Sequence, residues 1–372
     1  MSHKHATSVG TLRYSERFKG RAADGHFRDA QGLYCSSIGL GTYLGHYDDR
    51  TDEAYRSAIR KALELGCNVV DTASNYRFQR SERAVGTSIN AAISERVIAR
   101  DEVVVTTKGG YLPFDGEPPR SREEIQEYIE TTFVQTGICQ ESDFVRGAHC
   151  MNPRFLENQL DQSLNNLKLE TVDVYYIHNP ETQLPDVGPE EFYRRLKEAF
   201  VFLESAVSAG KIASYGTATW SGYREDPESR EYLSLKKVVD TAKEVAGDAH
   251  HFKVVQLPYN LSMIEAFGLP NQEVNGRQIS LLAAASELGV TVMSSASLLQ
   301  ARLAREVAPE LTQVFPNLET DAQRSLQFAR SAPEITTALV GMSKVDHVIE
   351  NLRLSAFAPA PKDKYLELFS TT

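Results

Sequence analysis

One pattern recurs along most of the chain: a short apolar run is followed by a segment in which apolar residues recur at helical spacing. The apolar runs, which we interpret as strands, are Ser37–Gly41, Asn68–Asp71, Val103–Lys108, Asp173–His178, Ile212–Thr217, Val254–Pro258, Thr291–Ser294 and Thr337–Val340. The helical segments after them are Asp52–Leu65, Ser81–Ile93, Asn152–Leu167, Pro189–Ala209, Leu233–Val245, Gln278–Leu288, Asp321–Ala332 and Val345–Leu352. Eight alternating units predict an α/β protein with a closed parallel (β/α)8 TIM barrel. A doubly wound sheet is the alternative, and the lack of a GxGxxG motif after the first strand argues against it.

Two segments fall outside this alternation, although we expect the whole chain, residues 1–372, to form a single domain. Near the N-terminus, Thr11–Phe18 and His26–Tyr34 alternate in polarity around Asp24-Gly25, which predicts a β-hairpin over residues 11–34. The interval 109–151 separates the third strand from its helix and is too long for an ordinary connection. Because it follows the carboxyl end of a strand, we expect an active-site loop that walls or covers the substrate. A structural flap or an interface element is the alternative.

Composition narrows the classes of partner. The net charge of −10 argues against a nucleic-acid or anionic-membrane surface, since both need basic patches. No apolar run approaches the roughly 20 residues of a membrane span, and the N-terminus lacks the features of a signal peptide, so a cytoplasmic protein is expected. The four cysteines suggest reduced thiols in a chain of 372 residues. His149, Cys150 and Cys139 invite a metal interpretation, but no metal-ligand spacing supports it and we expect no metal site.

Polar side chains end three successive predicted strands. The second strand ends at Asp71 and is followed closely by Tyr76, the third ends at Lys108, and the fourth ends at His178. The carboxyl ends of barrel strands meet at one mouth, so we expect these four residues to share an active site. A lysine ammonium lowers the pKa of a neighbouring tyrosine, and Asp71 can serve as the counter-ion of a buried Lys108. The set therefore predicts proton transfer to or from a carbonyl or alcohol oxygen that His178 orients by hydrogen bonding.

The arrangement of these motifs resembles that of the aldo-keto reductases. The likeness runs from about Ile38 to Asn351 and rests on Asp71-Thr-Ala-x-x-Tyr76, Ser81-Glu82, Thr107-Lys108 and Asp173-Val-Tyr-Tyr-Ile-His178-Asn-Pro180. The resemblance implies a catalytic tetrad of Asp71, Tyr76, Lys108 and His178, with Tyr76 as the general acid/base. It also implies NADP(H)- or NAD(H)-dependent reduction of a carbonyl or oxidation of an alcohol, with a small-molecule substrate.

The same resemblance implies where a nicotinamide cofactor would bind, and the chain departs from the family there. Gln256 matches the residue that hydrogen-bonds the carboxamide, whereas Ala218-Thr219 replaces the usual Ser-Asn and only Thr219 keeps a hydroxyl. Ser295 stands where the family has an aromatic ring that stacks on the nicotinamide, a contact worth about 1 kcal/mol. These departures suggest weak binding of the cofactor or a different pose.

For the phosphate groups, Ser294–Leu303 resembles the pyrophosphate loop, in which we single out Leu298 and Arg302. The last unit resembles the adenosine-phosphate segment, with Gly341, Ser343, Lys344, His347 and Asn351 as expected contacts. A helix N-terminus suits a phosphate, and Lys344 favours NADP, with NAD as the alternative.

We expect Tyr111, Asn179 and Trp220 to line the substrate pocket, because they follow strand ends. Polar residues at the mouth, Asn75, Arg77, Asn179 and Tyr259, favour a hydroxylated substrate over a steroid. Two other functions stay open: a nucleotide-sensing regulatory subunit, as in the potassium-channel β subunits, and a non-redox acid/base enzyme such as an epimerase or lyase. A homo-oligomer is possible, since many barrels assemble through their outer helices.

Overall fold

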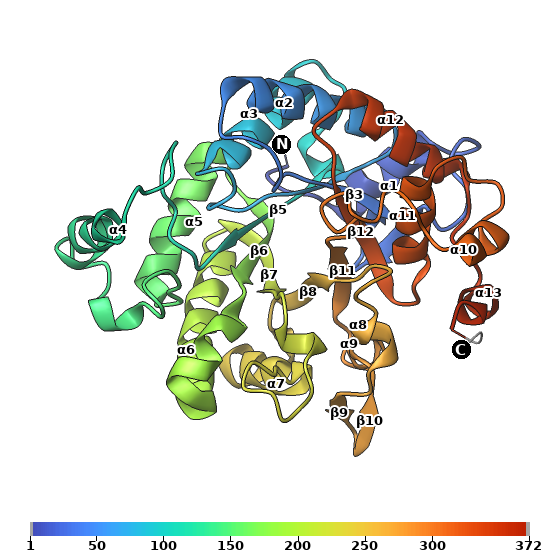
Figure 1. Ribbon diagram of the computed structural model, residues 1–372. Helices are drawn as coiled ribbons and strands as arrows, with labels where there is room; N and C mark the ends of the chain where they lie inside the picture. Colours follow the sequence, from blue (N-terminus) through green and yellow to red (C-terminus); the bar gives the residue numbers. More distant parts are fainter. Residues whose placement is uncertain (1–2, 370–372) are drawn as a thin grey trace.

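The computed structural model describes residues 3–369, in which eight parallel strands close into a barrel (Figure 1). Around the barrel the strands are β3 (Ile38–Gly41), β4 (Val69–Asp71), β5 (Val104–Gly109), β6 (Val172–His178), β7 (Ile212–Ala218), β8 (Phe252–Pro258), β11 (Thr291–Ser295) and β12 (Ile335–Gly341). Pairing of β8 with β11 and of β12 with β3 completes the ring. The predicted (β/α)8 barrel is confirmed, and each predicted strand overlaps an observed one.

Helices follow the strands on the outside of the barrel (Figure 1). They are α2 (Asp49–Glu64), α3 (Arg80–Ser94), α5 (Pro153–Leu167), α6 (Leu184–Ser208), α7 (Leu235–Ala246), α9 (Leu281–Glu287), α11 (Asp321–Ser331) and α12 (Val345–Leu352). The shorter helices are α8 (Glu265–Gly268), α10 (Pro309–Val314) and α13 (Lys362–Glu367). Helix α9 begins later than predicted, because β9 (Gln272–Val274) and β10 (Arg277–Ile279) form a hairpin ahead of it. None of the helices within residues 3–369 is both long and apolar enough to cross a membrane.

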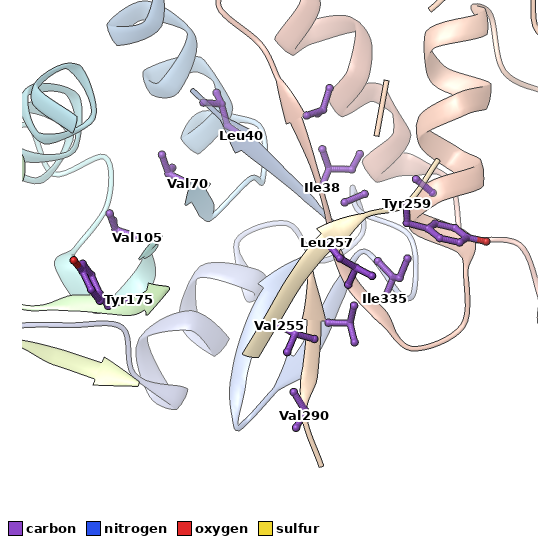
Figure 2. Close-up of a cluster of buried hydrophobic side chains, with 14 of the residues drawn as sticks. Ile38, Leu40, Val70, Val105, Tyr175, Val255, Leu257, Tyr259, Val290 and Ile335 are labelled. Atoms are coloured by element: carbon purple, nitrogen blue, oxygen red, sulfur yellow. The ribbon is translucent and has the colours of Figure 1, made fainter. Parts of the chain in front are cut away.

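The strands are apolar on both faces because both faces are buried. Successive residues belong to different clusters: Val69 and Val104 lie in the cluster inside the barrel, while Val70 and Val105 lie in the larger cluster beneath the helices. Figure 2 shows part of the outer cluster, to which Val255 of β8 also contributes. This two-sided burial explains the continuous apolar runs in the sequence.

The N-terminal segment corrects the predicted hairpin over residues 11–34. Residues 8–16 form helix α1 (Ser8–Glu16), in which the side chain of Thr7 caps the N-terminus by accepting from Gly10 N. The buried residues Thr11, Tyr14 and Phe18 recur at helical spacing, which the apparent alternation concealed. A hairpin does occur, but it pairs β1 (Phe27–Ala30) with β2 (Leu33–Ser36).

Its turn also differs from the prediction. The left-handed pair Gln31 (φ 57°) and Gly32 (φ 84°) makes the hairpin turn, and Asp24-Gly25 forms a separate turn before β1.

The segment 109–151 forms a small unit beside α5. It contains α4 (Arg122–Ile129), a π-helical turn over Glu130–Val134 and a short 3-10 helix over Glu141–Asp143. Its apolar side chains form a cluster with Phe155 of α5, made of Leu112, Ile129, Phe133, Cys139 and Cys150. Figure 1 shows α4 projecting at the side of the barrel, next to α5. All four cysteines of the chain are free thiols, as predicted, and all four are buried.

Candidate active site

A cavity of about 960 Å³ opens at the carboxyl ends of the barrel strands. Seven of the eight strands contribute to its wall, with Gly41, Asp71, His178, Ala218, Gln256, Ser295 and Leu339–Gly341. The exception is β5, whose Lys108 is buried beneath the cavity floor with 1% of its surface exposed. The volume lies at the upper end of the range for small-molecule sites, about 300–1,000 Å³.

Asp71 and Lys108 form an ion pair under the cavity. Lys108 Nζ donates to Asp71 Oδ2 at 2.6 Å and to the carbonyl of Thr72 at 2.8 Å. The other carboxylate oxygen, Oδ1, accepts from Thr106 Oγ1 at 2.7 Å and from Gln256 Nε2 at 2.8 Å. Burial lowers the pKa of Lys108, and the Asp71 carboxylate opposes this shift. The carboxylate therefore keeps the buried lysine charged, as the sequence predicts for a counter-ion.

Tyr76 lies above this pair. The ammonium of Lys108 sits 4.8 Å from the centroid of the Tyr76 ring. The Tyr76 side chain lines the cavity. Burial, followed by the charge of Asp71, raises the pKa of Tyr76 well above its usual value. This direction is opposite to the lowering expected from a neighbouring lysine ammonium. Tyr76 therefore carries a proton at neutral pH.

His178 faces the same part of the cavity. Its imidazole packs edge-on against Tyr76, with ring centroids 5.8 Å apart, and against Tyr111 at 5.2 Å. Burial and the positive charge of Lys108 lower the pKa of His178 well below its usual value. A neutral imidazole can donate a hydrogen bond to a carbonyl oxygen without competing with Tyr76 for the role of acid. The structure thus brings the four predicted tetrad residues together.

The three residues predicted for the substrate pocket, Tyr111, Asn179 and Trp220, all line the cavity. Asn179 Nδ2 donates to the Tyr111 hydroxyl at 3.3 Å. Trp220 is 47% exposed at the rim, and Glu181 accepts its backbone N–H at 2.7 Å. Tyr111 is the single residue of the segment 109–151 in the cavity wall, so most of that segment contributes no surface to the described cavity.

Two of the four residues predicted at the polar mouth lie elsewhere. Arg77 is buried and pairs with Asp52 at 2.7 Å, because the left-handed turn after Tyr76 directs it beneath α2. Tyr259 follows β8 into the apolar core (Figure 2). Its hydroxyl there meets that of Tyr365 at 2.5 Å. Asn75 and Asn179 do line the cavity.

Most residues predicted for the cofactor line the other half of the cavity. They are Thr219, Gln256, Ser295, Leu298, Gly341, His347 and Asn351. Arg302, Ser343 and Lys344 do not line it. Arg305, which the sequence analysis missed, takes the place expected for Arg302. Nothing in the sequence distinguishes the two arginines, since the path of the loop between them decides which one faces the cavity.

Unpartnered polar atoms mark this cavity as a ligand site. Asn75 Oδ1, Thr219 Oγ1 and Asn351 Oδ1 are buried, line the cavity and have no hydrogen-bond partner within the described residues. A buried polar atom without a partner costs about 1–3 kcal/mol, which a polar ligand would recover. These oxygen atoms therefore fit a nucleotide whose amide and hydroxyl groups donate hydrogen bonds to Thr219 and Asn351.

The loop after β11 carries strain in the same wall. Ala296, Leu299, Gln300 and Ala301 all have left-handed backbones, with φ of 53°, 44°, 54° and 67°, and all four line the cavity. Such residues cost roughly 1–3 kcal/mol each and cluster at ligand sites. Ser295, just before them, offers no aromatic ring, and the aromatic side chains in the wall are Tyr43, Tyr76, Tyr111 and Trp220. Within residues 3–369, no three His, Cys, Asp or Glu side chains gather as metal ligands.

Comparisons with known proteins agree with this geometry. A model of the Aldo/keto reductase family matches residues 37–369. The chain is 26% identical over 345 residues to a putative voltage-gated potassium channel subunit beta from Schizosaccharomyces pombe, covering 89% of this chain and 88% of that protein. It is 26% identical over 220 residues to a 6-dehydroglucose reductase from Novosphingobium aromaticivorans, covering 58% of this chain and 57% of that protein.

Among solved structures, an aldo/keto reductase from Klebsiella pneumoniae in complex with NADP and acetate is similar to this chain. The TM-score is 0.61 and the identity 18%, with 94% of this chain and 95% of that one covered. At this identity the similarity supports the barrel fold.

Proposed function

The chain belongs to the aldo/keto reductase family, and we propose that it is an NADP(H)-dependent oxidoreductase that interconverts a small carbonyl compound and its alcohol. One observation carries the proposal: the side chain of Tyr76 lines the cavity beside a buried Lys108–Asp71 pair and a neutral His178. This combination provides a proton donor, a charge to stabilise the resulting phenolate, and a donor to orient the substrate oxygen.

In the reduction, the neutral imidazole of His178 donates a hydrogen bond to the carbonyl oxygen and holds it near Tyr76. NADPH, when bound, supplies the hydride. Tyr76 gives its proton to the oxygen, and the phenolate that forms faces the ammonium of Lys108. Asp71 keeps that ammonium charged. Because burial raises the pKa of Tyr76, the hydroxyl keeps its proton at neutral pH, and the facing ammonium of Lys108 offsets part of the cost of releasing it to the substrate oxygen.

Thr219, Gln256 and Asn351 would hold the polar groups of the nucleotide. Arg305 and His347 would meet its phosphates from the cavity wall, which Lys344 does not line. The similar Klebsiella protein was solved with NADP, in line with this assignment.

A hydroxylated substrate fits the other half of the cavity. The amides of Asn75 and Asn179 offer donors and acceptors, while Tyr43 and Trp220 offer half-exposed aromatic faces. Amide groups beside aromatic faces suit the mixed surface of a sugar-like molecule. A relative named 6-dehydroglucose reductase is consistent with this substrate class.

A regulatory subunit is the second candidate, favoured by the similarity to the putative potassium channel subunit beta. A non-redox acid/base enzyme would use Tyr76 and Lys108 without a nucleotide. Consumption of NADPH over many turnovers separates both from the oxidoreductase, since a sensor binds without turning over and an epimerase or lyase consumes none.

The decisive experiment is reduction of an aldehyde panel, including aldoses and 4-nitrobenzaldehyde, followed by NADPH absorbance. We expect Tyr76→Phe to lower kcat by about 10²- to 10⁴-fold, the range for loss of a general acid. Tyr47→Phe is the matched control, because Tyr47 packs on Phe78 outside the cavity wall. Binding is followed separately by fluorescence of Trp220, the one tryptophan of the chain. Near wild-type turnover by Tyr76→Phe would overturn the assignment of the acid.

A further inference from the structure

His149 connects the segment 109–151 to the catalytic histidine. Its side chain is fully buried, and its backbone bridges to that of Tyr111 and of Val145. The ring nitrogen Nε2 lies 2.7 Å from the backbone carbonyl oxygen of His178. A side chain of this segment therefore touches the catalytic residue that ends β6, although most of the segment lies away from the cavity.

The neighbours of His149 fix which ring nitrogen carries the proton. Arg195 has only donors, and it lies 3.2 Å from the amide oxygen of Gln183. The amide nitrogen of Gln183 is thereby directed at His149 Nδ1, 3.1 Å away, which must accept. The proton then sits on Nε2, which donates to His178. Burial lowers the pKa of His149 to about 4, so this neutral form persists across the neutral range.

The end of β6 explains why this donor matters. The pairing of β5 with β6 stops at Gly109 and Ile177, one residue before His178. Asn179 then adopts a left-handed backbone (φ 46°) and turns the chain away. On its other side, His178 still pairs with Ala218 of β7. On the β5 side, beyond the last rung of the ladder, the carbonyl of His178 accepts the hydrogen bond from His149 instead.

Gly110 makes the close approach possible. A Cβ atom there would lie 2.9 Å from His149 Nε2 and 3.2 Å from the His178 carbonyl oxygen. The glycine also has a φ of +135°, which other residues rarely adopt. The chain thus leaves the space that this hydrogen bond needs.

His149 also supports the substrate side of the cavity. The Tyr111 ring packs edge-on between His149, at a centroid distance of 5.1 Å, and His178, at 5.2 Å. Tyr111 lines the cavity, so a movement of His149 would displace a wall residue and the catalytic imidazole together.

We propose that His149 is a positioning residue, which holds the imidazole of His178 and the ring of Tyr111 in place for the substrate carbonyl. Through this residue the segment 109–151 acts on the reaction from beside the cavity. The proposal rests on the proposed function in one respect, the assignment of His178 to the carbonyl oxygen.

Three variants test the proposal by reduction of 4-nitrobenzaldehyde with NADPH. His149→Phe keeps a ring against Tyr111 but removes the donor, and we expect kcat to fall by about tenfold to a hundredfold, the effect of a small misplacement. His149→Gln restores an N–H donor at a similar reach and should recover most of that loss. Tyr128→Phe is the matched control: it removes a hydrogen bond to the carbonyl of Pro113 in the same segment, far from the cavity wall. The affinity for NADPH should stay unchanged in all three.

A merely structural role predicts a different outcome, in which His149→Phe and Tyr128→Phe lower kcat equally and His149→Gln rescues nothing. Either result overturns the proposal.

A second measurement does not depend on turnover. In NMR spectra of protein with ¹⁵N-labelled histidine, the ring signals of His178 should shift in His149→Phe and stay in place in Tyr128→Phe. Unshifted His178 signals in His149→Phe refute the positioning role, even if the wild-type protein reduces no carbonyl. Shifted signals in a protein without reductase activity leave the positioning role intact and refute the proposed function instead.

Discussion

The buried pair of Lys108 and Asp71 yields the prediction with the largest expected magnitude. The two side chains are 1% and 6% exposed, with Nζ and Oδ2 2.6 Å apart. At an effective dielectric constant of ~20, two charges at this distance attract by roughly 6 kcal/mol. Desolvation cancels much of this energy, and removing one partner of such a pair costs about 3–5 kcal/mol because the other charge stays buried.

Asp71→Asn should therefore destabilise the protein by about 3–5 kcal/mol. In the wild-type protein, Thr106 and Gln256 donate hydrogen bonds to Asp71. An asparagine that presents its oxygen to Lys108 must turn its NH₂ group toward these two donors and loses their hydrogen bonds. Lys108→Met should cost less, because the carboxylate keeps those two hydrogen bonds. The double variant removes both buried charges and should lose at least about 2 kcal/mol less than the sum of the single changes.

Urea unfolding of the four proteins, followed by circular dichroism, measures this coupling. Strictly additive losses would refute the pairing and, with it, the argument that Asp71 keeps Lys108 charged. All three variants should also lose carbonyl reduction, but the stability cycle does not depend on that result.

Two further predictions concern the cofactor and pH. Arg305→Ala should weaken NADPH binding by about tenfold, because one charge-assisted hydrogen bond is lost. Arg302→Ala, the control, should bind NADPH with normal affinity. Equal affinities of the two variants in a fluorescence titration would show that Arg305 does not contact the nucleotide. Burial lowers the pKa of His149 and of His26 to about 4, and that of His178 well below its usual value. As the pH falls, these histidines are protonated in the unfolded chain at a higher pH than in the folded protein. The free energy of unfolding should therefore decrease as the pH drops below about 6.5, by roughly 1 kcal/mol per pH unit for each histidine. Thermal unfolding from pH 8 to pH 5 should show a shallower loss for His149→Gln, and an unchanged slope would contradict the assigned neutral state.

The barrel could be predicted from the sequence because its causes are local. Burial of both strand faces requires runs such as Val103–Thr107, and polar residues at the ends of such runs can only meet at the mouth. The tetrad followed from this, since Asp71 and His178 each end a strand and Lys108 is the next-to-last residue of its strand.

Features that depend on the path of a loop could not be predicted in the same way. Arg305 faces the cavity instead of Arg302 because three successive left-handed residues redirect the chain after Leu298. Arg77 is buried because a left-handed turn follows Tyr76. The sequence suggests His149 only as a metal ligand. Its contact with His178 joins residues 29 positions apart in the chain, and no spacing rule predicts such a contact.

Gln256 links the two halves of the cavity. It lines the cofactor half, yet its amide nitrogen donates to Asp71 at 2.8 Å. A ligand that turned this amide over would place an acceptor against the carboxylate and disturb the Lys108–Asp71 pair. A ligand that leaves the tetrad intact must therefore meet Gln256 at its amide oxygen, with a donor such as a carboxamide N–H. The departures at Ala218 and Ser295 remove a hydroxyl and a stacking surface, but they leave this contact untouched. We infer that they change how tightly a nucleotide is held more than whether the tetrad can act on its substrate.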